Sequence, residues 1–373
     1  IHLVPRVACM SNVDFRDIRV YFHCYPPGPP DRAAYQHGLV CLAEGLEKLG
    51  VASFASQNYW QKSTAGDDFL LRHDPRVEPQ DCDIVVADHA WIVYGGGLPH
   101  SLLRPNRGYR AVYLDGADGH PTFSWSEQAR DLDVILRSHY NSRLRNPPNM
   151  KPWAFGLSDR IIRYTADTAS PRQRAILVNF RLRHALRRRV KTIIFDPLTD
   201  VLPQDPAIDS FDTAGFEPLD RLFWEQTGRR HYPEYYQRLS SVLSCYCVGG
   251  FNLAPVFVDS MSLRKAWSKI TDVLYVNSRM IAQFDSWRFW ESLAAGCTAF
   301  HLDINKYGLR LPVMPENWQH YVGIDLERRR DTIRRIRDWV GDLEAIGSAG
   351  RDWALRNYAP APTARRFLEL VLS

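Results

Sequence analysis

The segment 285–297 contains the residues whose types and spacing best suit the binding of a ligand. Ser286 or the aspartate before it can cap the N-terminus of a short helix, and Gly296 can end that helix. The free N–H groups and positive dipole of such a helix end favour a phosphate, and Arg288 would add a guanidinium. Glu291 follows about one and a half turns later, where its carboxylate could accept ribose hydroxyls. The segment indicates a nucleotide, most simply a nucleotide-sugar, although a capped helix with a solvated glutamate is an equally common arrangement.

Acidic and imidazole side chains follow a predicted buried strand at 111–114. Asp115, Asp118 and His120 lie directly after that strand, in a loop loosened by glycines. Ligands of α/β sheets bind at the carboxyl ends of strands, so the aspartates could deprotonate an acceptor hydroxyl and the histidine could bind the acceptor. An ordinary Asp-Gly turn is the competing interpretation.

His89 follows another predicted strand, at 83–87, and is an alternative base or acceptor contact. A structural role is the more common one for a single histidine. Gly95 and Gly96 belong to a run of three glycines soon after it, which would let an acceptor approach the backbone closely. We therefore expect the acceptor near this loop and the loop of the two aspartates.

Two arginines, Arg137 and Arg181, each end a predicted strand. Either guanidinium could neutralise the diphosphate of a leaving nucleotide. No Asp-x-Asp triplet, which could hold a divalent metal, follows a predicted strand. We therefore expect cationic side chains to act where other enzymes use a metal, and we expect no cofactor besides the co-substrate.

Two series of predicted strands and helices must position these residues. Short continuous apolar runs, separated by helices and loops, are typical of parallel sheets that are covered on both faces. The first series consists of a helix at 31–49, ended by Gly50, and strands at 17–24, 51–54, 83–87, 111–114 and 134–136. The second consists of strands at 175–180 and 298–302, a helix near Tyr235, a strand near Val242 and the helix at Ser286. We predict an α/β protein with two Rossmann-like doubly wound domains, 1–165 and 166–373.

The composition narrows the class of protein. With 373 residues, of which 45% are hydrophobic and 24% are charged, the chain suits a soluble protein of two domains. No apolar run is long enough to cross a bilayer, and no signal peptide is evident. The seven cysteines include no CxxC pair and no zinc-like spacing with histidine, which favours free thiols and a cytoplasmic location.

The net charge of +5 is concentrated in two arginine-rich stretches, 181–191 and 328–337. Such stretches could bind nucleic acid, or could let the protein associate peripherally with an anionic membrane surface. In the second stretch, Ile333 and Ile336 alternate with the arginines at the spacing of an amphipathic helix. We favour a solvated helix face there, and a nucleic-acid partner is the weaker interpretation.

The C-terminal half carries a series of motifs in a fixed order. They are Arg288-x-x-Glu291, Gly296-Cys297, Leu311-Pro312, Trp318, the tail 350–358 and, upstream, Tyr235 leading to Cys247-Val248-Gly249-Gly250. Together they resemble the nucleotide-binding half of GT-B glycosyltransferases, and most closely the exostosin-like and spore-protein-like groups. The resemblance covers the C-terminal half well and the N-terminal half loosely.

The resemblance implies two domains that face each other across a cleft, and a last helix, at 363–372, that could cross back to the first domain. It implies transfer of a sugar from a nucleotide-diphosphate donor to a hydroxyl of a glycan, lipid-linked or small-molecule acceptor, without a metal. The donor would contact residues of the second domain: Ser286, Arg288, Glu291, Arg181, Tyr246, Gly249 and Gly250. The acceptor would contact residues of the first domain: Gly95, Gly96, His120 and Arg137. If the sugar is transferred with inversion, the base is Asp115, Asp118 or His89.

The sequence departs from these groups at one position. Retaining members often carry two glutamates eight positions apart, and we align the earlier one with Phe284. The stereochemistry therefore stays open. A catalytically silent module that binds a glycan or a nucleotide stays open for the same reason.

Overall fold

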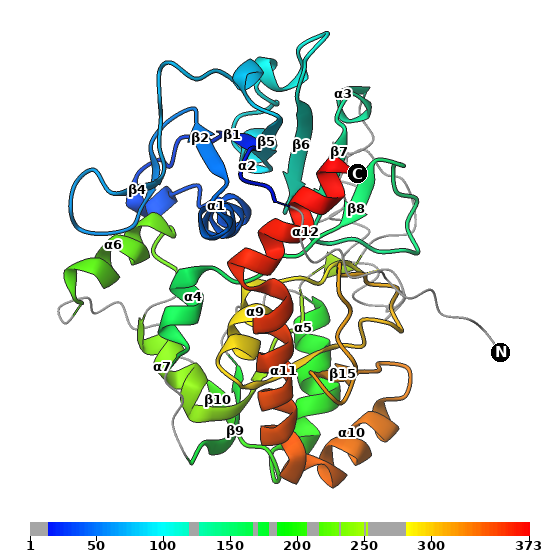
Figure 1. Ribbon diagram of the computed structural model, residues 1–373. Helices are drawn as coiled ribbons and strands as arrows, with labels where there is room; N and C mark the ends of the chain where they lie inside the picture. The colour runs from blue at the N-terminus through cyan, green and yellow to red at the C-terminus, as the bar shows by residue number, and fades with distance from the viewer. Residues whose placement is uncertain are drawn as a thin grey trace.

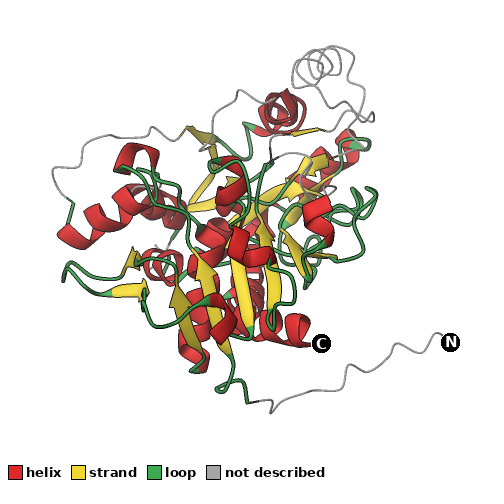
Figure 2. Ribbon diagram, turned by 90° about the horizontal axis from the view of Figure 1, so that it is seen from above, coloured by secondary structure: helices red, strands yellow, loops and turns green. Residues whose placement is uncertain are grey.

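The chain forms two parallel β-sheets, one in each half, with helices packed around them (Figures 1 and 2). The computed structural model describes residues 14–118, 127–166, 171–178, 185–206, 216–230, 233–249, 251–252 and 281–373. The prediction of two Rossmann-like α/β units is confirmed by these two sheets. Each sheet brings the carboxyl ends of its strands to one edge, where an α/β fold places its ligands.

The first sheet has six parallel strands in the order β2-β1-β5-β6-β7-β8. The strands are β1 (Arg19–His23), β2 (Ala52–Ala55), β5 (Ile84–Asp88), β6 (Arg110–Asp115), β7 (Val134–Arg137) and β8 (Met150–Pro152). A separate antiparallel pair consists of β3 (Tyr59–Gln61) and β4 (Phe69–Leu71). The central strands are buried apolar runs, which explains why their sequence pattern predicts them well.

The helices of the first half include one that starts later than its sequence indicates. They are α1 (His37–Leu49), α2 (Ala90–Val93), α3 (Glu127–Arg130) and α4 (Asp159–Tyr164). We expected α1 to start at Asp31, but the proline-rich residues there form only a 3-10 turn and Gln36 keeps a non-helical backbone. The side-chain amide of Gln36 accepts a hydrogen bond from the backbone N–H of Tyr25 and donates one to its carbonyl. These two bonds connect the proline-rich loop to the start of the helix. Gly50 ends α1 as predicted, at a φ of +72°.

The second sheet has five parallel strands in the order β10-β9-β11-β14-β15. The strands are β9 (Gln173–Val178), β10 (Gln204–Pro206), β11 (Val242–Tyr246), β14 (Thr298–Leu302) and β15 (Val322–Ile324), and β12 (Phe251–Asn252) pairs with β13 (Ile281–Gln283) separately. The helices are α5 (Ala185–Val190), α6 (Pro218–Gln226), α7 (Pro233–Ser241), α9 (Trp287–Ala294), α10 (Arg329–Asp338) and α11 (Leu343–Tyr358). Strand β14 occupies the residues that the sequence predicts.

The last helix, α12 (Pro360–Leu372), leaves the second half and packs on α1 of the first (Figure 1). The two helices touch so closely that a Cβ at Gly45 would lie 2.0 Å from the carbonyl oxygen of Pro360. Phe367 and Leu368 of α12 join the hydrophobic core around the first sheet. Neither α12 nor another helix in the described part of the chain is long and apolar enough to cross a membrane.

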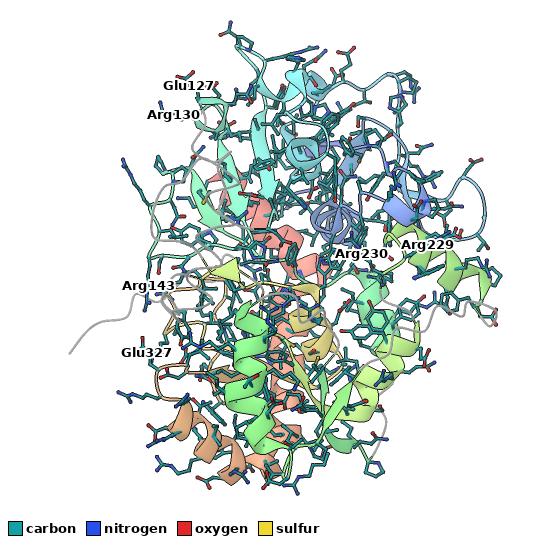
Figure 3. The ribbon with its side chains drawn as sticks, turned by 180° about the vertical axis from the view of Figure 1, so that it is seen from behind. Glu127, Arg130, Arg143, Arg229, Arg230 and Glu327 are labelled. Atoms are coloured by element: carbon teal, nitrogen blue, oxygen red, sulfur yellow. The ribbon has the colours of Figure 1, made fainter. Side chains whose placement is uncertain are left out.

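Loops of the first sheet also reach the second half. After β7, Asn141 donates a hydrogen bond to the carbonyl of Ile281 at 2.9 Å, and Arg143 donates to the carbonyl of Lys306. Figure 3 shows Arg143 at the boundary between the two halves. These contacts hold the carboxyl ends of β6 and β7 near the segment that precedes α9.

Candidate functional site

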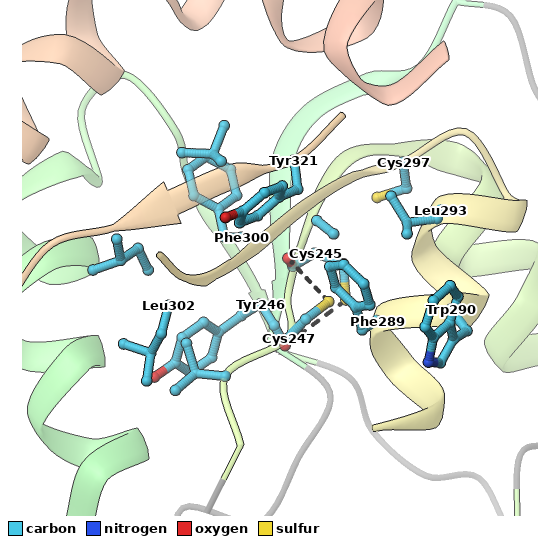
Figure 4. Close-up of a cluster of buried hydrophobic side chains, with 14 of the residues drawn as sticks. Cys245, Tyr246, Cys247, Phe289, Trp290, Leu293, Cys297, Phe300, Leu302 and Tyr321 are labelled. Atoms are coloured by element: carbon cyan, nitrogen blue, oxygen red, sulfur yellow. Dashed lines mark hydrogen bonds between the residues drawn. The ribbon is translucent and has the colours of Figure 1, made fainter. Parts of the chain in front are cut away.

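Helix α9 is anchored by its apolar face. Phe289, Trp290 and Leu293 are buried in the core with residues of β11 and β14 such as Phe300 (Figure 4). Gly296 follows the helix at a φ of +67°, and its amide donates to the carbonyl of Leu293 at 2.8 Å. The helix therefore presents its N-terminus in a fixed direction.

The N-terminus of α9 has the features of an anion site. Ser286 occupies the N-cap position with an extended backbone (φ −157°, ψ 150°), but its side chain makes no capping hydrogen bond. Its Oγ is buried and lacks a hydrogen-bond partner among the described residues. Arg288 lies in the first turn of the helix. A buried hydroxyl, the first helix amides and a guanidinium favour a phosphate at this point.

A second guanidinium lies close to this helix end. Arg187 of α5 is 8% exposed, and its Nε donates to the carbonyl of Val248 at 3.2 Å. Burial, followed by the positive charge of Arg288, lowers the pKa of Arg187 to about 10. Two cations that disfavour each other's charge in a buried setting gain stability when an anion binds between them.

Two other predicted donor residues lie beside these arginines. The hydroxyl of Tyr246 donates to the carbonyl of Arg187 at 2.9 Å, so this fully buried side chain holds α5 in place. At Gly249, a Cβ would lie 2.4 Å from the carbonyl oxygen of Gln283, so only glycine allows this close approach. The loop after β11 is thereby pressed against the segment before α9.

Glu291 is completely buried beneath the helix end. Its carboxylate accepts hydrogen bonds from the hydroxyls of Tyr236 at 2.9 Å and Tyr235 at 3.2 Å. Arg160 in turn donates to the Tyr236 hydroxyl at 2.9 Å, which places a positive charge near the carboxylate. Tyrosine hydroxyls occupy both carboxylate oxygens in the structure, so the contact between Glu291 and ribose stays a prediction.

On the first sheet, Asp88 and His89 form a pair at the end of β5. The Nδ1 atom of His89 lies 3.1 Å from Oδ2 of Asp88, whose other oxygen accepts the amide of Ala90 at 2.9 Å. Burial acts to lower the pKa of His89, but the charges of Asp88, Asp115 and Asp118 outweigh it and raise the pKa above 6.5. With Nδ1–H donated to a carboxylate, Nε2 is the atom that can take a proton.

Asp115 and Arg137 neutralise each other. Their Oδ1 and Nη1 atoms are 2.7 Å apart, and both side chains are almost completely buried. The same Nη1 also donates to the carbonyl of Ala117 at 2.8 Å. This ion pair ties the end of β6 to the end of β7 and shapes the loop that follows β6.

Asp118 is the exposed acid of that loop, with 63% of its side chain accessible. Gln283 donates its amide to Oδ1 of Asp118, and Nε2 of His139 lies 3.5 Å from the same oxygen. Partial burial opposes ionisation, but the contacts with His139 and Gln283 and the charge of His89 lower the pKa of Asp118. The carboxylate is therefore ionised at neutral pH.

The structure gives less information about the remaining predicted site residues. Gly95 packs against the carbonyl of Trp91, where a Cβ would lie at 2.7 Å, and Gly96 has a φ of +75°. Arg181, His120 and Gly250 lie outside the described residues. Within the described ranges, no group of three or more His, Cys, Asp and Glu side chains could hold a metal ion.

Three residues of this region were not predicted from the sequence: Arg187, His139 and Gln283. Gln283, not Phe284, stands eight positions before Glu291, so our alignment of the earlier acid was wrong by one residue. Phe284 is a buried core residue beside His139. His139 follows the end of β7, so the strand-end rule that selected His89 could have found it.

Comparison with known proteins identifies the fold. No protein-family profile matches the chain, and no curated protein matches it in sequence. Among solved structures, an α-glucosyltransferase in complex with UDP and a 13-mer DNA matches with a TM-score of 0.54 and 11% identity. That match covers 95% of this chain and 99% of the other.

A second similar structure is AviGT4, a glycosyltransferase involved in avilamycin A biosynthesis. It matches with a TM-score of 0.51 and 13% identity, over 95% of this chain and 97% of the other. At these identities the likeness concerns the fold alone. With its two Rossmann-like units, this chain has the GT-B glycosyltransferase fold.

Proposed function

We propose that this protein transfers a sugar from a nucleotide-diphosphate donor to a hydroxyl acceptor. The observation that carries the proposal is the pair Arg187 and Arg288 at the N-terminus of α9, beside the buried Oγ of Ser286. A diphosphate would neutralise both guanidiniums and accept bonds from the hydroxyl and the helix amides. The α-glucosyltransferase of the same fold occurs in complex with UDP and with UDP-glucose, which supports a uridine nucleotide as the first ligand to test.

We assign donor and acceptor to the two sheets. The second sheet, from about residue 166 onwards, would bind the donor through α9 and the loop at Gly249. The carboxylate of Glu291 would bind the ribose hydroxyls, either directly or through the hydroxyl of Tyr235. The first sheet would bind the acceptor at the ends of β5 and β6. The exposed loop at Gly95 and Gly96 would border that acceptor site.

His89 is our choice of base for an inverting transfer. Asp88 holds its Nδ1–H, so Nε2 can remove the proton of the acceptor hydroxyl. The acceptor oxygen then forms a bond to the anomeric carbon while the bond from that carbon to the diphosphate oxygen breaks. The electron pair leaves on the diphosphate, whose charge Arg187 and Arg288 stabilise. Asp115 is unsuited to the role because its carboxylate is buried against Arg137.

The two arginines would also replace a metal ion at the diphosphate. Transfer should therefore continue in EDTA, and added Mn²⁺ should not raise the rate. Loss of transfer in EDTA with recovery in Mn²⁺ would contradict this part of the proposal.

A transfer assay tests the proposed function. UDP-, GDP-, TDP- and ADP-sugars are incubated with the protein and a panel of hydroxyl acceptors, and release of the nucleotide diphosphate is measured. We expect one nucleotide to be released faster with an acceptor present, and Arg288→Ala to abolish the increase. Arg229→Ala is the matched control, because this exposed arginine follows α6 and its guanidinium lies over the ring of Trp224. Equal release by wild type and Arg288→Ala would contradict the proposal.

A further inference from the structure

His139 lies directly after β7, with its side chain completely buried. The backbone N–H of Asp285 donates to its Nδ1 at 3.2 Å. A neutral imidazole that accepts at Nδ1 must carry its proton on Nε2. Burial is the main cause that lowers the pKa of His139; the contact with Asp118 opposes it, the charge of Arg137 adds to it, and the charges of Asp118 and Asp115 oppose it further. The ring is therefore neutral at pH 7, with Nε2 as a donor.

The Nε2 atom points at one carboxylate. It lies 3.5 Å from Oδ1 of Asp118 and has no hydrogen bond among the described residues. The rings of Phe155 and Phe284 stand edge-on to the imidazole, with centroids at 5.5 Å and 6.0 Å, and fix its plane. A buried N–H group that makes no hydrogen bond costs free energy. The Nε2–H group would therefore gain stability by a shorter contact with Asp118 when a ligand occupies the site.

The contacts of Asp118 come from both halves of the chain. Asp118 and His139 follow strands of the first sheet, whereas Gln283 and Asp285 precede α9 in the second half. Gln283 donates to Asp118, and Asp285 supplies the N–H that sets the tautomer of His139. Asp285 is itself fixed there, because its carboxylate accepts the amide of Phe155 at 2.7 Å. The position of Asp118 thus depends on how the segment 283–285 lies against the first sheet.

We propose that His139 is a positioning residue of the acceptor site, which with Gln283 orients the exposed Asp118 carboxylate to bind an acceptor hydroxyl. The inference rests on the proposed function and names a part of it that neither the motifs nor the comparisons assign. The acceptor anchor is complete only when both halves of the chain are in the arrangement seen here. His139 does not act as a base, because its proton-accepting Nδ1 is taken by Asp285.

Kinetics of two variants test the positioning role. His139→Phe keeps the ring volume and removes the donor, so we expect the acceptor KM to rise by about 10-fold or more while the donor KM stays unchanged. His139→Gln can place an amide N–H near the former Nε2 and should restore most of the acceptor affinity. An unchanged acceptor KM in His139→Phe would overturn the proposal. Equal losses for donor and acceptor, without rescue by Gln, would show a merely structural role and overturn it too.

His301→Phe is the matched control. His301 is also buried and contacts the same Phe284, but its ring nitrogens face the carbonyls of Leu302 and Phe284. We expect this variant to lower the melting temperature without a selective change in the acceptor KM.

A spectroscopic measurement separates this proposal from the proposed function. In ¹⁵N-histidine NMR spectra of the full chain at pH 7, His139 should show the tautomer protonated at Nε2. Asp118→Asn should shift the Nε2 signal. A ring protonated at Nδ1, or an Nε2 signal that ignores Asp118→Asn, would overturn the role of His139 whether or not the protein transfers a sugar. Absence of transfer with the expected spectra would instead contradict the proposed function alone.

Discussion

The two sides of the candidate site are built in opposite ways. The proposed donor side is cationic, and its central part is one helix, α9, whose cap, arginine and stop glycine are neighbours in sequence. The proposed acceptor side is mainly acidic, and it gathers Asp88 and His89 from the end of β5 and Asp118 from the loop after β6. A site made by one helix can be predicted from a short motif, whereas a site made at the ends of two strands exists only after the sheet has formed.

The largest expected effect lies on the acceptor side, at His89. His89→Ala should lower kcat by about 10²–10⁴-fold with donor binding unchanged, because a base acts in the chemical step. The base must be unprotonated and its pKa is raised above 6.5, so wild-type kcat should fall as the pH decreases through a value above 6.5. Rates measured across pH 5–9 check this. Full activity of His89→Ala beside an inactive Asp118→Asn would move the base to Asp118.

The ion pair of Asp115 and Arg137 should affect the free energy of unfolding more than the rate of transfer. Asp115→Asn and Arg137→Met each remove one charge of this buried ion pair, which costs about 3–5 kcal/mol of unfolding free energy. The double variant should lose less than the sum of the single variants. Urea unfolding of the three proteins measures the coupling. Additive losses would show that the two charges do not depend on each other.

On the donor side, Arg288→Ala should weaken binding of a nucleotide diphosphate by about 1.5–3 kcal/mol, the range for a charge-assisted hydrogen bond. Binding of the nucleoside without phosphates should hardly change, because the guanidinium is assigned to the diphosphate. Calorimetric titration of both ligands separates the two effects. Equal losses for nucleoside and nucleotide would place Arg288 elsewhere in the site.

The ribose assignment of Glu291 predicts a smaller effect that a second ligand can isolate. Glu291→Ala should weaken nucleotide binding, and a 2′-deoxy nucleotide should bind wild type less tightly than the ribonucleotide does, by about 1 kcal/mol for one hydrogen bond. The preference for ribose should vanish in Glu291→Ala. A preference that survives in the variant would mean that Tyr235 and Tyr236, and not the nucleotide, are the partners of this carboxylate.

The sequence predicts the fold better than it predicts the site. Apolar runs such as Thr298–Leu302 form strands where expected, since their burial in a parallel sheet leaves little other choice. The start of α1 was predicted too early, because the residues around Asp31 form only a 3-10 turn and Gln36 keeps a non-helical backbone. Helix α9 could be predicted because Ser286 at its start and Gly296 after its end are typical of helix termini. Arg187 could not be singled out, since only folding distinguishes it from the other arginines of its stretch.

Contacts between the two halves were the hardest to foresee. Nothing in the local sequence of His139 indicates that the amide of Asp285, well over a hundred residues away, sets its tautomer. The partners of Glu291 were equally hidden, although Tyr235 and Tyr236 stand in a recognised helix. Their hydroxyls reach the carboxylate only because folding brings residues of α7 and α9 together.

Ligand-induced stabilisation of the folded protein is the most direct test for a diphosphate site between Arg187 and Arg288. Melting temperatures of the wild type are measured against rising concentrations of UDP-, GDP-, TDP- and ADP-sugars, with a CMP-sugar as the monophosphate comparison. We predict that at least one diphosphate ligand raises the melting temperature with concentration, that the CMP-sugar does not, and that Arg288→Ala removes the rise. No shift with any of the diphosphates, or an equal shift in Arg288→Ala, would contradict it.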